Sequence, residues 1–258
     1  MNNKRQILMA IALIAVTTLA TVPLEAQRGR GGRGARQEPS GPAPRLPDGT
    51  PDFSGLWLGG GTNNGDITRA LKPGEELVML PWAEERMTTL RSQNDPQANC
   101  LPSGVPRGSP YPWRMIQTPT HGPATHIFML FEGNIHSYRQ IFMDGRDHPE
   151  DPDPTWFGHS VGRWDGDTLV VDSVGFNDRF WFDYLGHPHT EQLHIVERYT
   201  RTDMDNIAID TTITDPGTYE KPFTVAGRAR LQEGEILEYI CNEYNIDLEH
   251  VDAPAQLP

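Results

Sequence analysis

Residues 192–231 decide the fold: QLHIVERYTRTDMDNIAIDTTITDPGTYEKPFTVAGRARL. Three runs rich in β-branched side chains cover residues 192–201, 207–214 and 223–231, and the turn-forming residues 204–206 separate the first two. Runs of this kind, interrupted by Asn, Asp and Gly, are typical of antiparallel strands joined by tight turns. The stretch therefore predicts a three-stranded antiparallel meander.

The same pattern extends in both directions along the chain. Turn signals at residues 132–134, 165–166 and 233–234 predict further hairpins. An open sheet of so many strands would expose two edges. We therefore expect an all-β antiparallel meander closed into a β-barrel, with one short N-terminal helix at residues 81–93. The additional strands are predicted at residues 113–118, 126–131, 135–143, 159–164, 168–174 and 236–241.

The N-terminal region has the pattern of a secretory signal peptide over residues 1–26. Lys4 and Arg5 precede an apolar run, and Ala26 offers a cleavage position. Residues 27–50 are rich in Gly, Arg and Pro, which predicts a flexible tether. The β-barrel domain would then cover residues 51–258. We expect a periplasmic or secreted protein with no membrane span after cleavage, and an uncleaved anchor is the alternative.

The chain is acidic, with a formal net charge of -13. A surface of this sign repels the phosphate backbone of nucleic acids and anionic lipid. We therefore expect no nucleic-acid partner, and a small-molecule ligand or substrate instead.

The two cysteines, Cys100 and Cys241, form an even pair. In an exported protein such a pair predicts one disulfide. It would tie the Pro-rich early region to the predicted strand at residues 236–241. Two separately buried thiols are the alternative, because the presence of two cysteines does not prove that they meet.

Several motifs carry a resemblance to known families. DFSGLW at residues 52–57 resembles the Gly-x-Trp first strand of calycin barrels such as lipocalins, in which the tryptophan closes the barrel floor. Longer motifs, together spanning roughly residues 51–245, resemble a family of secreted, largely uncharacterised bacterial proteins of soil and degradative bacteria. The resemblance implies a calycin-like β-barrel and no particular activity. These motifs are CLPSGVPR at 100–107, DGRDHP at 144–149, GRWDGDTLVVDSVGFND at 162–178, GHPHT at 186–190, ERY at 197–199 and EYICNEYN at 238–245.

Charged residues within the predicted strands suggest ligand-binding groups. In residues 192–201, Glu197 and Tyr199 share one face while Arg198 lies on the other, so whichever face is inward carries a charge. Buried charges need internal pairing or a ligand. We therefore take Tyr199, Glu197, Arg198 and Glu238 as candidate ligand-binding residues. The alternatives are a structural ion pair of the Arg198–Glu238 type and charges that face solvent.

The loops between the predicted strands supply candidate catalytic residues. If these loops meet at one barrel mouth, Asp183 orients a histidine, and His189 and His148 act as general acid and base. Arg146 would balance developing negative charge, and Trp181 would add an aromatic ligand-binding surface. Alternatively, the histidines lie in surface loops and the aromatic residues cap the core.

The same loops allow a metal interpretation. His148, His187, His189 and Glu191, with His194 as a further candidate, offer ligands that suit zinc, copper or iron. Their spacing matches no HExxH motif, and the chain has no G-x-S-x-G elbow, phosphate loop or dinucleotide fingerprint. We expect no cofactor, with a divalent metal such as zinc as the alternative.

The leading hypothesis is a secreted enzyme that performs cofactor-independent acid–base chemistry, either elimination, isomerisation or hydration, on a small organic molecule in a barrel pocket. Two alternatives stay open. One is a non-catalytic, lipocalin-like binding protein for a small apolar or aromatic ligand, because such an architecture supports binding as readily as chemistry. The other is a metal-dependent enzyme that uses histidine and carboxylate ligands. The sequence predicts neither the substrate nor the oligomeric state.

Overall fold

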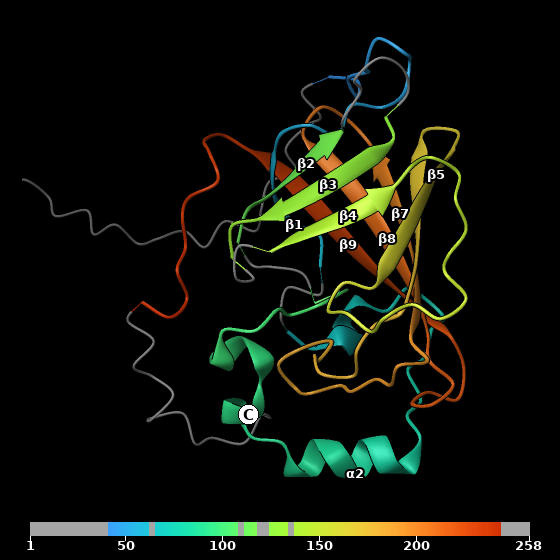
Figure 1. Ribbon diagram of the computed structural model, residues 1–258, viewed down its shortest axis with the longest axis vertical. Helices are drawn as coiled ribbons and strands as arrows, with labels where there is room; N and C mark the ends of the chain where they lie inside the picture. Colours follow the sequence, from blue (N-terminus) through green and yellow to red (C-terminus); the bar gives the residue numbers. More distant parts are fainter. Residues whose placement is uncertain (1–40, 62–64, 108–110, 118–123, 134–136, 244–258) are drawn as a thin grey trace, which may run out of the picture. The chain divides into compact units, whose positions relative to one another are not determined.

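The computed structural model describes residues 41–61, 65–107, 111–117, 124–133 and 137–243. Within these residues, nine strands form a closed barrel in which neighbours in the sequence pair with each other and β9 returns to β1 (Figure 1). The predicted all-β barrel is confirmed, whereas the calycin-like label stays a prediction. The strands are β1 (Leu56–Gly59), β2 (Trp113–Gln117), β3 (His126–Phe131), β4 (Tyr138–Phe142), β5 (His159–Asp165), β6 (Thr168–Val174), β7 (His194–Arg201), β8 (Asn206–Thr214) and β9 (Phe223–Gln232).

The strand at residues 236–241 is the one wrong prediction among the nine predicted runs. This segment follows β9 without strand structure. Its expected place beside β9 is taken by β1, which pairs with β9 from Leu56↔Gln232 to Gly59↔Ala229. Because that edge of β9 already has a partner, the chain leaves the barrel after Gly234.

The meander is antiparallel except at a seam between β4 and β5. These two strands run parallel and pair only through Ile141↔Ser160 and Phe142↔Val161. The connection at residues 143–158 contains several prolines and is too long for a tight hairpin. It therefore carries the chain back, so that β5 starts at the same end of the barrel as β4. Here the structure differs from the predicted antiparallel meander.

Short helices occupy the long connection between β1 and β2. They are η1 (Ile67–Ala70), α2 (Pro81–Thr89), η2 (Ser92–Asn94) and η3 (Pro96–Asn99), and α2 lies beyond one end of the barrel (Figure 1). The predicted helix begins at Pro81 as expected, because proline suits the first helical position. It ends at Thr89, before the predicted end. In the part of the chain that the structure describes, no helix has the length and apolar character needed to cross a membrane.

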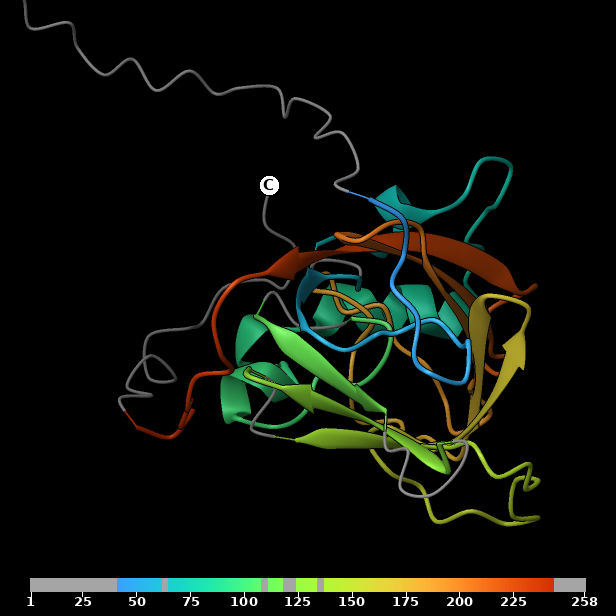
Figure 2. The same ribbon diagram turned by 90° about the horizontal axis from the view of Figure 1, so that it is seen from above.

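Alternating side chains fill the barrel interior. Every second residue of β3, β7 and β8 is buried, as the period of a strand requires. Phe53 and Trp57 are fully buried near β1, where Trp57 Nε1 donates to the Phe53 carbonyl oxygen at 2.9 Å. Seen from above, the green strands β2 to β4 lie across the barrel from the red β9 (Figure 2). The core therefore lies between these two walls.

Cys100 and Cys241 form a disulfide, with their Cα atoms 5.6 Å apart. The predicted pairing is confirmed. Because Cys241 lies beyond β9, the bond ties the residue that follows η3 to an irregular segment and not to a strand.

Candidate functional site

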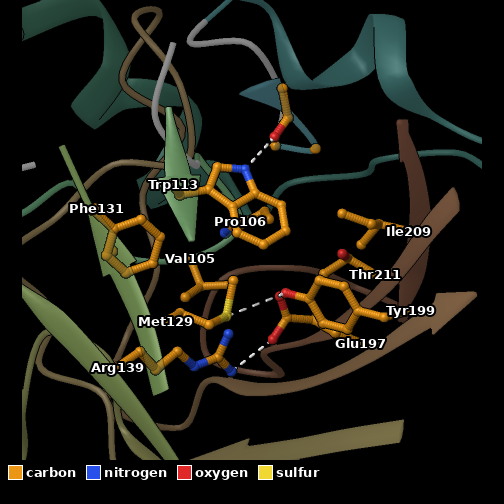
Figure 3. Close-up of a pocket in the computed structure, with 14 residues that line it drawn as sticks. Val105, Pro106, Trp113, Met129, Phe131, Arg139, Glu197, Tyr199, Ile209 and Thr211 are labelled. Atoms are coloured by element: carbon orange, nitrogen blue, oxygen red, sulfur yellow. Dashed lines mark hydrogen bonds and ion pairs between the residues drawn. The ribbon is translucent and has the colours of Figure 1, made fainter. Parts of the chain in front are cut away.

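The barrel contains a cavity of about 40 Å³ with a mostly apolar wall (Figure 3). Clefts for drug-sized ligands are roughly 300–1,000 Å³, so this cavity suits a few water molecules or a compact ligand. Its wall combines side chains of five strands with the end of β1, the turn after it and loop residues before β2. The lining residues are Gly59, Gly60, Gly61, Gly104, Val105, Pro106, Trp113, Met129, Phe131, Arg139, Glu197, Tyr199, Ile209 and Thr211.

One side of the cavity carries a buried cluster of charged and polar groups. Glu197 and Tyr199 lie two positions apart on β7, so both point inward, and Arg139 reaches them from β4 (Figure 3). Arg139 Nη2 lies 2.6 Å from Glu197 Oε2, and the Tyr199 hydroxyl donates to Glu197 Oε1 at 2.6 Å. Arg139 also donates to the hydroxyls of Ser160 at 3.1 Å and Ser173 at 2.8 Å. The cluster therefore joins β4, β5, β6 and β7.

Burial and pairing set the charges in this cluster. Burial lowers the pKa of Arg139, but its interactions with Glu197 and Tyr199 together outweigh burial, so the pKa is raised. Burial raises the pKa of Tyr199 well above its ordinary value, and the charge of Glu197 adds to the rise. At neutral pH the cluster thus contains a guanidinium cation and a neutral phenol. Both lie against the Glu197 carboxylate, as in a charge-assisted hydrogen-bonded pair.

Two polar atoms in the cavity wall have spare hydrogen-bonding capacity. The Thr211 side chain, from β8, lines the cavity, and its hydroxyl has no hydrogen bond to any part of the chain that the structure describes. Glu197 Oε2 makes the ion pair with Arg139 but no hydrogen bond of standard geometry within the described residues. Buried polar atoms normally have a partner. A ligand with a polar group would therefore complete this wall.

The predicted ligand-binding residues separate into two groups. Glu197 and Tyr199 line the cavity. Arg198 faces outward and pairs with Asp165 at 2.7 Å, and so not with Glu238. Glu238 is exposed in the irregular segment after β9, and Trp181 is buried but lies outside the cavity wall. Only two of the five predicted residues therefore meet.

Asp183 contacts a histidine, as predicted, but this histidine is not His189. The His189 ring stacks on Phe182 at a centroid distance of 5.0 Å and packs at a tilt against Phe180 at 4.0 Å. Burial lowers the pKa of His189 to about 4, so its imidazole is neutral at neutral pH. Asp183 instead accepts a hydrogen bond from His187 Nδ1 at 2.6 Å. The residue that Asp183 orients is therefore His187.

His148 and Arg146 lie in a different group, on the outside of the barrel near the β4–β5 seam. His148 contacts His159 and Asp172, and His194 contacts the same aspartate. Arg146 pairs with Asp144 at 2.5 Å and covers the ring of Phe142. Among the described residues, no hydrogen bond, ion pair or ring contact joins these residues to His189 or Asp183, so the four predicted catalytic residues form two separate clusters.

The metal interpretation has the same difficulty. His148 lies in the outer group, His187 and His189 lie in the buried group, and Glu191 is exposed. Across residues 41–243, apart from the gaps given above, no group of three or more His, Cys, Asp and Glu side chains has an arrangement that could hold a metal ion. The alternative metal set is therefore not assembled.

Sequence reasoning missed Arg139, Thr211, Ser160 and Ser173. For Arg139 a signal was present, because it shares a strand face with the apolar Ile141 in the predicted run at residues 135–143. An arginine at an inward position predicts either a partner or a ligand. The two serines carry no such signal, since small polar residues occur on either face of a strand.

Comparisons with protein-family models, with curated proteins and with solved structures found no match to this chain. The resemblance to a family of secreted bacterial proteins therefore stays a prediction.

Proposed function

We propose that this protein binds a compact, largely apolar small molecule with one polar group in the barrel cavity. The observation that carries the proposal is the buried ion pair of Arg139 and Glu197 on the cavity wall. A buried ion pair seldom stabilises a fold more than apolar residues of similar volume do. Polar groups in a mostly apolar cavity are, in contrast, typical of ligand sites, where they orient the ligand.

The wall restricts the chemistry of the ligand. Trp113, Met129 and Ile209 offer apolar contacts, while Thr211 offers the open hydrogen-bonding position, because Glu197 Oε2 is buried and already faces Arg139. The charges of Arg139 and Glu197 already balance each other, so a neutral ligand fits better than an ion. A small alcohol or amide meets these conditions, because its O–H or N–H group can donate to the Thr211 hydroxyl oxygen.

Binding fits this geometry better than acid–base catalysis does. The Tyr199 hydroxyl proton is already donated to Glu197, and the guanidinium of Arg139 faces the same carboxylate. None of the predicted catalytic residues His189, His148, Asp183 and Arg146 lines the cavity. A carrier or sensor of a small molecule needs no proton acceptor there.

The proposal includes a location outside the cytoplasm. The disulfide between Cys100 and Cys241 is compatible with an oxidising compartment, because structural disulfides persist mainly in exported proteins. Cleavage near residue 26 remains the sequence-based expectation.

The proposal can be tested with small alcohols and amides of about three to six non-hydrogen atoms. Ligands of this size reach at most about -1.5 kcal/mol per non-hydrogen atom, so we expect dissociation constants in the range of about 10 µM to 10 mM. Thr211→Val keeps the side-chain shape and removes the hydroxyl. It should weaken binding of the best compound about fivefold, the value of one hydrogen bond.

Thr212→Val is the matched control, because Thr212 is the next residue of β8 and its hydroxyl bonds Thr224 on the outer face. It should leave binding unchanged. Calorimetric titration of both variants provides the measurement. If no compound of the series binds the wild-type protein, or if both variants bind equally, the cavity is not the ligand site.

A further inference from the structure

A second hollow lies at the seam where β4 and β5 diverge, and its lining reaches inward to Arg139 and Ser160 of the buried cluster. The two strands pair only at Ile141↔Ser160 and Phe142↔Val161. Next to these pairs the sheet opens into a groove of about 610 Å³. Tyr138, Phe142 and Trp156 contribute aromatic rings to its lining, and His159 contributes an imidazole. The Tyr138 side chain is strongly exposed, at 60%. The groove has the size of a typical small-molecule site.

His159 is held by a chain of hydrogen bonds that begins at Asp172. His148 Nε2 lies 3.2 Å from Asp172 Oδ1, and His194 Nε2 lies 2.7 Å from the same oxygen. At the other edge of the His148 ring, Nδ1 lies 2.9 Å from His159 Nδ1. Phe142 stacks on His159 with a centroid distance of 5.0 Å. The hydrogen bond thus fixes the rotation of the His159 ring in its plane, and the stacking contact fixes its tilt.

The order of donors and acceptors along this chain is determined by Asp172. A carboxylate only accepts hydrogen bonds, so Nε2 of His148 must be the donor. A neutral imidazole has one donor and one acceptor, so Nδ1 of His148 accepts and Nδ1 of His159 donates. The remaining nitrogen, Nε2 of His159, then has a free lone pair.

The surroundings leave this lone pair available to a ligand. Among the described residues, none makes a hydrogen bond with Nε2 of His159. This nitrogen is also not fully buried, so a ligand can reach it. Burial and the nearby charges of His148 and Arg146 lower the pKa of His159. The groove thus combines aromatic rings with one oriented acceptor.

We propose that the groove is a second binding site, for a neutral phenolic ring whose hydroxyl donates to Nε2 of His159 while the ring packs against Tyr138 and Trp156. A phenol is favoured over a sugar because its flat apolar ring matches the aromatic side chains of the lining and its single strong donor matches the acceptor at His159. The groove shares Arg139 with the wall of the barrel cavity, but Tyr138, Trp156 and His159 do not line that cavity. Asp172 and His148 act as positioning residues.

The test compares phenol with anisole, which has the same ring but no hydroxyl proton, at about pH 8, where phenol is still neutral. Wild-type protein should bind phenol about fivefold more tightly than anisole, as one hydrogen bond predicts. In His159→Phe the preference should disappear. His126→Phe is the matched control, because His126 also packs on Phe142 but does not line the groove, and Thr211→Val controls for binding inside the barrel. Both controls should keep the preference.

Nitrogen NMR of the imidazoles gives a readout that does not depend on ligand affinity. It should show His159 protonated at Nδ1 and not at Nε2, and Asp172→Asn should change this tautomer in a folded protein. Three results would overturn the proposal: equal affinity for phenol and anisole in the wild type, a preference that survives in His159→Phe, or a proton on Nε2 of His159. Binding of glucose with no binding of phenol would assign the groove to sugars and also overturn it.

Discussion

The two halves of the barrel are built differently. Strands β6 to β9 are long and fully paired, with β7 and β8 matched over eight residue pairs from His194↔Thr214 to Arg201↔Ile207. In the other half, β4 and β5 share only two pairs. The interior cavity takes Glu197, Tyr199 and Thr211 from the long strands and Arg139 from the short ones. The extensively paired strands β7 and β8 thus form a rigid wall that positions polar groups, while the incomplete pairing of β4 with β5 leaves space at the seam.

The outer faces of the two halves differ in the same way. β7 and β8 present residues such as Arg198 and Asp210, which form exposed ion pairs. β3 and β4 present Phe128, Tyr138 and Phe142, whose rings lie close to one another or to neighbouring imidazoles. A polar outer face is the expected state of a sheet in water, whereas clustered aromatic residues indicate contact with a ligand or partner.

The largest expected effect comes from breaking the link between the two halves. Arg139→Met leaves the buried Glu197 carboxylate without its cation, which should lower the free energy of unfolding by about 3–5 kcal/mol. Adding Glu197→Leu should recover most of that loss. Arg198→Met is the control, because its pair with Asp165 is exposed and should contribute less than about 1 kcal/mol. Urea unfolding measures all three variants, and equal losses at positions 139 and 198 would remove the distinction.

The histidines provide a second contrast, because His189 is buried whereas His194 is only partly buried. The pKa of His189 is about 4 in the folded protein, below the ordinary value of 6.5. The unfolded chain therefore binds a proton first as the pH falls. Stability should be complete above about pH 6.5 and should decrease by roughly 3 kcal/mol as the pH approaches 4.

His189→Phe should flatten the pH dependence of the urea midpoint in that window. An identical profile for His189→Phe and the wild type would mean that folding does not lower the pKa of His189.

The seam should also respond to a small change in volume. A methyl group added at Gly162 of β5 would overlap Met143 Sδ and would lie 2.8 Å from Ile141 Cγ2. Gly162→Ala should therefore cost about 1–3 kcal/mol of unfolding free energy, and Met143→Ala in the same chain should relieve part of that cost. Thermal unfolding measures the effect. An unchanged midpoint for Gly162→Ala would show that β4 and β5 separate easily.

Most of the strands could be predicted from the sequence, the long ones as well as the short β2 and β3. In residues 192–231, β-branched residues alternate with polar ones, so period and propensity agree. The segment at residues 236–241 has the same local pattern and yet forms no strand. The edge of β9 is instead paired with β1, which is distant in the sequence, and a local pattern does not encode such a pairing. The parallel seam was missed for the same reason.

The candidate site was predictable only where strand period identifies the inward face. Glu197 and Tyr199 were found because they share a face with apolar residues of β7. The loop residues His189, His148, Asp183 and Arg146 were grouped by closeness in sequence, although loops have no fixed period that brings their side chains together. Pairing of Asp183 with His187 and of His148 with His159 depends on tertiary contacts.

The central claim is that a small molecule binds in the barrel cavity, and methyl NMR tests it most directly. The protein would be labelled at methionine and isoleucine methyl groups and titrated with the tightest-binding alcohol or amide. The account predicts saturable shifts for Met129 and Ile209, which line the cavity, and none for Ile116, which is exposed on β2. Saturable shifts at Ile116 with unchanged Met129 and Ile209 signals would contradict the account.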